Sequence, residues 1–406
     1  MNSNCEKRLW LLLISSIVFA LQPAHADVVT DWNVTAMDAS AQTNSAVQSR
    51  ALAITHAAVF DAVNAITGKY KAYLAEVKAP AGASQEAAAA ASAHAVLSWL
   101  FPSQKGMLDA ALTGSLAKVP DGAAKEDGVA VGKKIAEKYI SMRGEDGSAR
   151  EMDYTPRQGA GQWQPTPPAN APMVIPQWAE VTPFVLKSAA ELAAKGPPAL
   201  DSAQFAKDLD EVRRLGARDS KERSADQTAA AIFWVINTAV PWNAAARATA
   251  VAKGTSVIEN ARIFALMNMA SADAYIASWA IKKQYGFWRP VTAIRNAAKN
   301  PDPNWEPLLN TPAHPDYVSG HCIYSGAAAR ALQQLFGDNG VKFSATFGGP
   351  NGVTRTYPGF AQAEKEVEEA RVWGGIHFRT ADEHGTALGH QIADLAVQRH
   401  MQPLPR

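Results

Sequence analysis

Residues 256–290 read SVIENARIFALMNMASADAYIASWAIKKQYGFWRP. The part from 256 to 283 is long and strongly apolar, which is typical of a helix that is buried on most of its sides. Gly286 is a plausible end for this helix, and Arg289 is then expected on the turn that follows. A chain with such a helix at its centre needs other helices to cover it.

The rest of the chain supplies those helices. Residues 45–67 carry apolar side chains at helical spacing and end before Gly68, and Ser84 opens an alanine-rich helix that closes before Pro102. Further helices are expected over 125–142, 202–215, 226–240, the segment after His321, and about 383–400. Since the clearest candidate for a strand is a minor hairpin arm at 341–347, we predict an all-α fold.

Residues 154–198 differ from this pattern because they are rich in proline and hold Trp163 and Trp178. Proline excludes a regular helix there, so this segment, here called the strap, is extended. A flexible linker between two domains is one interpretation, but the tryptophans favour an ordered loop on the protein surface. We therefore expect one helical domain over 27–406, with its core at 256–400.

The N-terminus has the pattern of a secretion signal. Lys7 and Arg8 precede an apolar run at 9–21, and residues 24–26 (Ala-His-Ala) offer a cleavage site before Asp27. The run is short for a membrane span, although an uncleaved anchor is an alternative. We expect a mature chain, residues 27–406, that is exported to the periplasm or secreted and has no stable membrane insertion.

Charge and cysteine content exclude several kinds of partner. The chain has 39 basic and 38 acidic residues, a balance that gives no reason to expect nucleic acid or an anionic membrane as partner. Removal of the signal leaves Cys322 as the single cysteine, so no disulfide can form within the mature chain. The sequence leaves open whether the protein forms a homo-oligomer.

Three short strings carry the chemistry: Lys282-x6-Arg289-Pro290, Ser319-Gly320-His321 and Arg371-x5-His377. Together they offer three cations, a hydroxyl, a glycine amide and two imidazoles, which suits a tetrahedral oxyanion such as phosphate or vanadate. Each string alone has an ordinary explanation, as cations at a helix C-terminus, an N-cap serine or a structural histidine. Their order and spacing favour a single anion site.

The strings resemble those of the vanadium-dependent haloperoxidases and their relatives, the type 2 phosphatidic acid phosphatases and the bacterial acid phosphatases. The shared pattern is Lys-x6-Arg-Pro, Pro-Ser-Gly-His and Ser-Arg-x5-His. The run from Phe287 to Arg295 and the Thr311-Pro312 pair are closest to the chloroperoxidase-like branch. The resemblance implies packed helix bundles as the architecture.

The resemblance also implies roles. Vanadate is the expected cofactor, with His377 bonded to vanadium and His321 as the acid–base for hydrogen peroxide. The oxyanion would be held by Lys282, Arg289, Ser319, Gly320 and Arg371. Halide would be oxidised to a hypohalous equivalent that halogenates a small organic substrate. Trp279 looks like the chloroperoxidase halide-pocket tryptophan and His314 like the bromoperoxidase histidine, so we expect bromide to react more readily than chloride.

The alternative implied by the same family is a phosphomonoesterase that binds phosphate, with His377 as the nucleophile that becomes a phosphohistidine. A silent anion-binding protein is a third reading. The chain departs from the family pattern at Val318 (usually Pro), Ala370 (usually Ser) and Ala381, where phosphatases often have the Asp that orients the histidine. This last change argues against a phosphatase unless Asp382 takes that place.

Cys322 follows His321 directly. An exposed thiol in a peroxide pocket is expected to be oxidised and to inactivate the enzyme, whereas a buried thiol would be inert.

Overall fold

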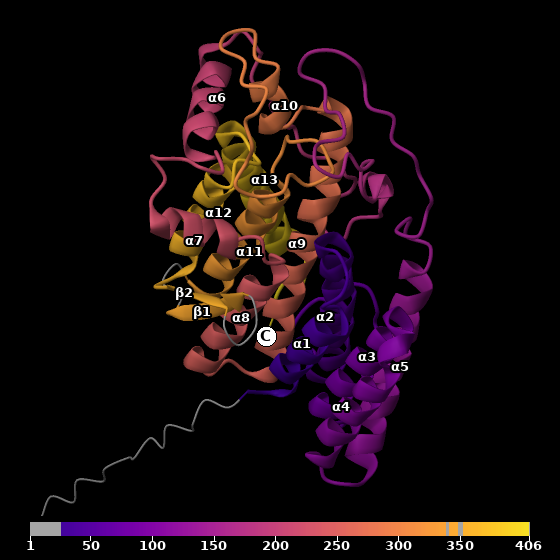
Figure 1. Cartoon of the computed structure of the whole chain (residues 1–406). Coiled ribbons are helices and arrows are strands. Elements are labelled where there is room, and N and C mark those ends of the chain that lie inside the picture. Colours follow the sequence, from indigo (N-terminus) through magenta and orange to yellow (C-terminus); the bar gives the residue numbers. More distant parts are fainter. Residues whose placement is uncertain (1–25, 338–340, 348–351, 406) are drawn as a thin grey trace, which may run out of the picture.

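The computed structural model describes residues 26–337, 341–347 and 352–405. Within these ranges the chain forms thirteen α-helices, two short 3-10 helices and one small antiparallel sheet (Figure 1). The predicted all-α fold is therefore confirmed. Residues 1–25, which hold nearly all of the predicted signal peptide, lie outside the described residues. No helix in the described part of the chain is long and apolar enough to cross a bilayer.

The N-terminal helices pack together on one side of the molecule (Figure 1). They are α1 Val28–Ala39, α2 Ser45–Thr67, α3 Gln85–Leu100, α4 Lys105–Ala117 and α5 Ala123–Arg143, with a 3-10 turn η1 at Pro102–Gln104. The predicted limits of α2 and α3 are confirmed. Gly68 ends α2 with a left-handed φ of 60°, and the Ser84 hydroxyl accepts the Ala87 amide at the start of α3.

Helix α9 (Val257–Tyr285) is the axis of the fold, and 22 of its 29 residues are buried. It contacts α2 of the N-terminal group and also α11 and α13 of the C-terminal group. A helix covered on both sides is expected to be mostly apolar, as the sequence indicated, and the polar residues it buries, such as Asp273 and Lys282, need partners. Its start is fixed because the Glu259 carboxylate accepts the Ser256 amide at 2.8 Å.

The C-terminal helices surround the other side of α9 (Figure 1). They are α6 Ala203–Leu215, α7 Ala225–Phe233, α8 Ala239–Lys253, α10 Pro290–Arg295, α11 Gly320–Phe336, α12 Phe360–Trp373 and α13 Arg379–Arg399. Strands β1 (Phe343–Phe347) and β2 (Val353–Tyr357) pair antiparallel and form the expected minor hairpin.

One predicted helix, 226–240, is wrong because the chain breaks between α7 and α8. Pro241 has no amide hydrogen and is tolerated in the first turn of a helix, so a new helix starts at Ala239. The break at 234–238 also frees a main-chain carbonyl. The Trp234 carbonyl accepts a hydrogen bond from Arg371 at 2.7 Å.

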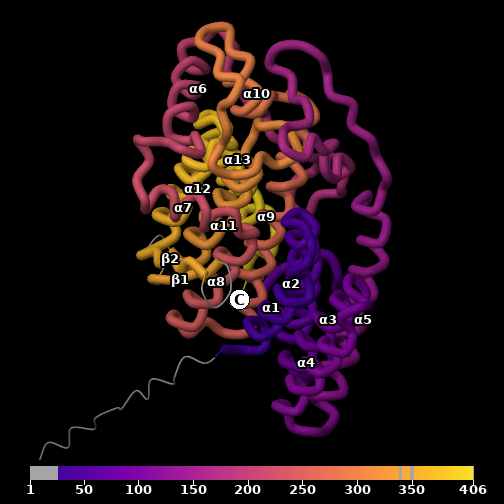
Figure 2. The backbone as a smooth tube through the Cα atoms, viewed as in Figure 1, coloured from indigo at the N-terminus to yellow at the C-terminus, as the bar shows by residue number. Residues whose placement is uncertain are grey.

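The strap runs along the outside of the molecule from the end of α5 toward α10 (Figure 2). It contains a 3-10 turn, η2 at Pro176–Glu180, and its Trp163 and Trp178 are 1% and 2% exposed. The Trp163 amide donates to the Gly286 carbonyl at 2.6 Å. These contacts describe an ordered strap, as the tryptophans indicated.

Further along, Asp273 of α9 anchors the strap. Its carboxylate accepts three consecutive amides, at 2.7, 2.7 and 2.8 Å, from Phe184, Val185 and Leu186. Burial raises the pKa of Asp273 to about 6, although these amides favour its charged form. One carboxylate thus fixes the return of the strap against the central helix.

Candidate active site

The ends of several helices bring the three sequence strings to one cavity and its surroundings. Lys282 lies in the last turn of α9, and Arg289 is the residue before α10. Ser319 precedes α11 and Gly320 is its first residue, so the free amides of this helix end face the site. Arg371 lies in the last turn of α12, and His377 lies in the loop between α12 and α13.

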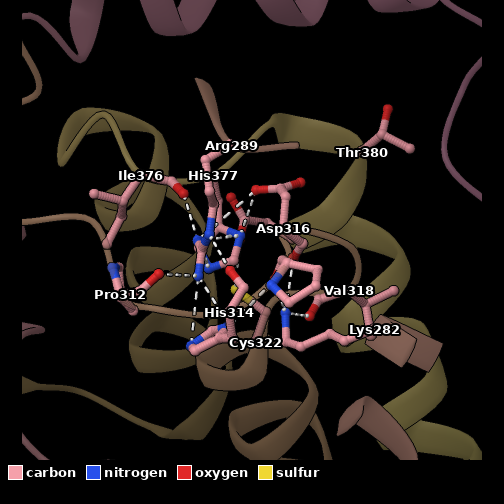
Figure 3. A network of polar contacts seen from close by, with 12 residues as sticks. Lys282, Arg289, Pro312, His314, Asp316, Val318, Cys322, Ile376, His377 and Thr380 are labelled. Carbon is pink, nitrogen blue, oxygen red and sulfur yellow. Dashed lines mark hydrogen bonds and ion pairs between the residues drawn. The ribbon is translucent and has the colours of Figure 1, made fainter. Parts of the chain in front are cut away.

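Lys282 is fully buried and holds the loop that leads into α11. Its ammonium donates to the carbonyls of Pro315 at 2.7 Å, Asp316 at 2.9 Å and Val318 at 2.6 Å (Figure 3). Burial lowers the pKa of Lys282 well below its usual range, and nearby Arg289 lowers it further. The three carbonyls therefore compensate a cation that has left water.

Arg289 is also fully buried and joins two histidines (Figure 3). Its Nη1 lies 3.0 Å from Nε2 of His377 and donates to the Ile376 carbonyl at 2.6 Å. Its Nη2 lies 2.9 Å from Nδ1 of His314, and its Nε donates to the His314 carbonyl at 2.8 Å. The guanidinium plane is thereby fixed beside both rings.

His377 is a buried, neutral imidazole. Burial lowers the pKa of His377 well below its usual range, and the charges of Arg289 and Lys282 lower it further. Its Nδ1 lies 2.8 Å from Oδ1 of Asp316. Burial raises the pKa of Asp316 to about 7, and its ionised form at this distance favours a proton on Nδ1. Nε2 is then an acceptor, and its lone pair faces Nη1 of Arg289 at 3.0 Å.

His321 and Arg371 carry unused hydrogen-bonding groups. Among the described side chains, the buried Nε2 of His321 and Nε of Arg371 have no hydrogen-bond partner. Burial lowers the pKa of His321 well below its usual range, with Arg371 as the next cause, while the Ile236 backbone opposes the shift. Unpartnered buried groups of this kind are costly unless a ligand satisfies them. An oxyanion accepts from arginine and exchanges protons with histidine, so this donor set fits vanadate.

A cavity of about 280 Å³ connects these residues to the surface. Of the predicted site residues, it is lined by Gly320, His321, Arg371, His377, Trp279 and His314. Lys282, Arg289 and Ser319 are fully buried beside it. The rim includes Val174 and Ile175 of the strap and residues 44–46 at the start of α2, a contribution from the N-terminal helices that the sequence did not indicate.

Trp279 and His314 form one wall of the cavity, with ring centroids 5.1 Å apart. The indole Nε1 of Trp279 donates to the Val174 carbonyl at 3.2 Å and so ties the wall to the strap. Burial lowers the pKa of His314 well below its usual range, with the charge of Arg289 as the next cause. This wall is therefore neutral and aromatic.

Asp382 is not the carboxylate that lies beside His377. Its Oδ1 accepts a hydrogen bond from the Cys322 thiol at 3.2 Å, whereas the carboxylate beside His377 belongs to Asp316. Sequence reasoning missed Asp316, and the available signal was an acidic residue inside the string from His314 to His321.

Cys322 is fully buried, which removes the condition under which we expected peroxide to inactivate the enzyme through this thiol. Burial raises the pKa of Cys322 well above its usual range, and the neighbouring Asp382 raises it further. The thiol is thus protonated, and a protonated, buried thiol is a poor nucleophile.

Comparisons with known proteins agree with this geometry. Residues 262–405 match the family model of the VCPO (vanadium chloroperoxidase) second helical-bundle domain. Vanadium chloroperoxidase of Curvularia inaequalis is 26% identical over 277 residues, a match that covers 55% of this chain and 45% of that protein. The chain thus matches less than half the length of this curated relative.

Two solved structures are similar over nearly their whole length. A bacterial vanadium-dependent iodoperoxidase has a TM-score of 0.80 and 28% identity, and the match covers 93% of this chain and 97% of that one. A bacterial vanadium-dependent chloroperoxidase in its holo form has a TM-score of 0.71, with coverage of 93% and 95%, but only 17% identity, so it shows the shared fold alone. These matches make the chain similar to the vanadium haloperoxidases, in sequence over residues 262–405 and in fold over nearly its whole length.

Proposed function

We propose that this protein is a vanadate-dependent haloperoxidase that uses hydrogen peroxide to oxidise halide and so halogenates small organic molecules. The observation that carries the proposal is the state of His377. Its Nδ1 faces a carboxylate at 2.8 Å, and its Nε2 lies among buried cations at the wall of the cavity. A neutral imidazole whose Nε2 is an acceptor can bind a metal in exchange for the Arg289 contact, and the surrounding cations balance an oxyanion.

The residues that would hold vanadate are Lys282, Arg289, Ser319, Gly320, Arg371 and His377. Bound vanadate supplies a Lewis acid that activates peroxide. The chain contributes charge neutralisation through its three cations, and the unpartnered Nε2 of His321 accepts a proton from peroxide. Burial lowers the pKa of His321 well below its usual range, which favours the neutral form of this ring.

For the halide, we propose that bromide reacts more readily than chloride. Bromide is the more weakly hydrated anion, so it loses less free energy when it leaves water for a cavity lined by aromatic rings. The wall formed by Trp279 and His314 is aromatic and neutral, and it offers chloride little compensation for lost water. The similar bacterial protein is described as an iodoperoxidase, which is consistent with a preference for the larger halides.

The test uses purified protein loaded with orthovanadate, with bromide- and peroxide-dependent halogenation of a diketone as the readout. Hydrolysis of a phosphate ester is measured in parallel without vanadate. Halogenation that His377→Ala abolishes supports the proposal. Ester hydrolysis without halogenation identifies the phosphatase alternative, and silence in both assays indicates an anion-binding protein. Running chloride, bromide and iodide side by side tests the halide order.

We also propose that the protein is exported and cleaved before Asp27. The Asp27 side chain caps α1, accepting the amides of Val29 and Thr30 at 3.0 Å each, so cleavage at this bond leaves the first helix with its cap. N-terminal sequencing of protein from the periplasm or medium should give Asp27 as the first residue. Full-length protein retained in the cytoplasm would contradict this proposal.

A further inference from the structure

Asp316 is the carboxylate nearest to the proposed vanadium ligand. Its side chain is fully buried, and its Oδ1 lies 2.8 Å from Nδ1 of His377 (Figure 3). The backbone of Asp316 is fixed on both sides, because its amide donates to the Phe287 carbonyl at 2.9 Å and its carbonyl accepts from Lys282. The main chain that carries this carboxylate is therefore held in place beside the histidine.

We propose that Asp316 is a positioning residue that holds His377 with its proton on Nδ1 and its Nε2 lone pair directed at the cation cluster. In related phosphatases an aspartate four residues after the histidine orients it, and here that position is Ala381. The carboxylate instead comes from the loop before α11, 61 positions earlier in the chain than His377. This inference rests on the proposed role of His377 as the residue bonded to vanadium.

A simpler role for Asp316 would be that of counter-ion to the buried cations. Its Oδ1 is 3.9 Å from Nη1 of Arg289, which is a long contact compared with the 2.8 Å to His377. The two roles predict opposite effects on anions. A counter-ion competes with any bound oxyanion, so its removal should strengthen the binding of phosphate and vanadate alike. A positioning residue affects only the ligand that bonds to the imidazole nitrogen.

The experiment therefore compares two oxyanions of nearly the same shape and charge. Equilibrium dialysis measures the Kd of vanadate and of inorganic phosphate for the wild type, Asp316→Ala, Asp316→Asn and Asp382→Asn. Asp382 is the matched control, since it is an equally buried carboxylate whose Oδ1 accepts from Cys322. Thermal unfolding of each variant reports whether it is folded.

We expect Asp316→Ala to lower the ratio of vanadate affinity to phosphate affinity by at least tenfold, the usual effect of losing an outer-shell partner of a metal-bound histidine. Asp316→Asn keeps an acceptor oxygen and should restore the ratio to within about threefold of the wild type, as should the control Asp382→Asn. If Asp316→Ala strengthens the binding of both anions and leaves the ratio of their affinities constant, Asp316 is a counter-ion and the inference is overturned. The inference is also overturned if Asp316→Asn does not restore the ratio.

A second readout is independent of vanadate. In the vanadate-free protein labelled with ¹⁵N in its histidine rings, His377 should show a protonated Nδ1 and an unprotonated Nε2, with the signals assigned by their loss in His377→Ala. The reverse tautomer in the wild type overturns the inference even if Asp316→Ala does not fold. If instead His377→Ala leaves vanadate affinity unchanged, the proposed function fails, an outcome distinct from failure of the role of Asp316.

Discussion

Replacement of Lys282 by methionine tests whether this buried cation organises the anion site. Methionine has a similar length, but it leaves the carbonyls of Pro315, Asp316 and Val318 without their donor. Each buried carbonyl without a partner costs about 1–3 kcal/mol. Part of this is offset because an ammonium no longer has to be desolvated, so we expect a net loss of about 3–5 kcal/mol in the free energy of unfolding.

The unfolding entropy of a chain of this size is roughly 0.8 kcal/mol per kelvin. A loss of about 4 kcal/mol therefore corresponds to a decrease in Tm of about 5 °C. Calorimetry measures this decrease, and hydrogen exchange of the Ser319 amide should report a loosened loop. Lys283→Met is the matched control, because Lys283 is a partly exposed neighbour whose contact to Glu180 at 3.0 Å is worth at most about 1 kcal/mol.

If Lys282→Met lowers Tm no more than Lys283→Met does, the carbonyl contacts contribute little and the argument is refuted. A large decrease in Tm in both variants would instead indicate a general sensitivity of the end of α9. In either case, vanadate affinity is measured separately, because Lys282 is also a proposed ligand of the anion.

Three further predictions concern other residues. Arg371→Lys removes the buried Nε that has no partner among the described residues. This change should weaken vanadate binding about tenfold or more, measured by dialysis. An unchanged Kd would contradict the proposed arginine contact. His314→Phe removes a hydrogen-bonding ring from the cavity wall and should lower kcat/KM for bromide by about tenfold; an equal loss for every halide would argue against a halide role. Folding raises the pKa of Asp273 from 3.8 to about 6. Between these pH values Asp273 is protonated in the folded state and ionised in the unfolded state. The resulting contribution to the free energy of unfolding, up to about 3 kcal/mol, should be lost as pH rises from 4 to 6. Asp273→Asn should flatten that part of the stability profile measured by denaturant unfolding, and an identical slope in both proteins would refute the assignment.

Local rules were enough to predict most of the helices. Gly68 and Ser84 set helix limits because a left-handed end and a side-chain cap depend only on neighbouring residues. The break after α7 was missed because the apolar pattern continues through Trp234, and Pro241 lies beyond the end of the predicted helix at 240. Helices α1, α4, α8, α10 and α12 were not predicted.

The sequence predicted which residue types would gather at the site, but not the contacts among them. Order and spacing identified the cations and histidines, because such chemistry needs particular residue types. Which carboxylate faces His377 depends on how the loop before α11 folds, and Asp382 and Asp316 are indistinguishable by type. The burial of Cys322 likewise depends on the packing of α11 against α13.

The strap has a consequence for how the entrance of the cavity can vary. Its Val174 and Ile175 form part of the entrance, while the groups proposed to hold the oxyanion lie on the helix ends beneath. Val174 is held through its main chain, because its amide donates to the Ala313 carbonyl at 3.0 Å and its carbonyl accepts from Trp279 at 3.2 Å. A change of side chain at 174 keeps both main-chain groups, so the shape of the entrance can change while the strap stays attached.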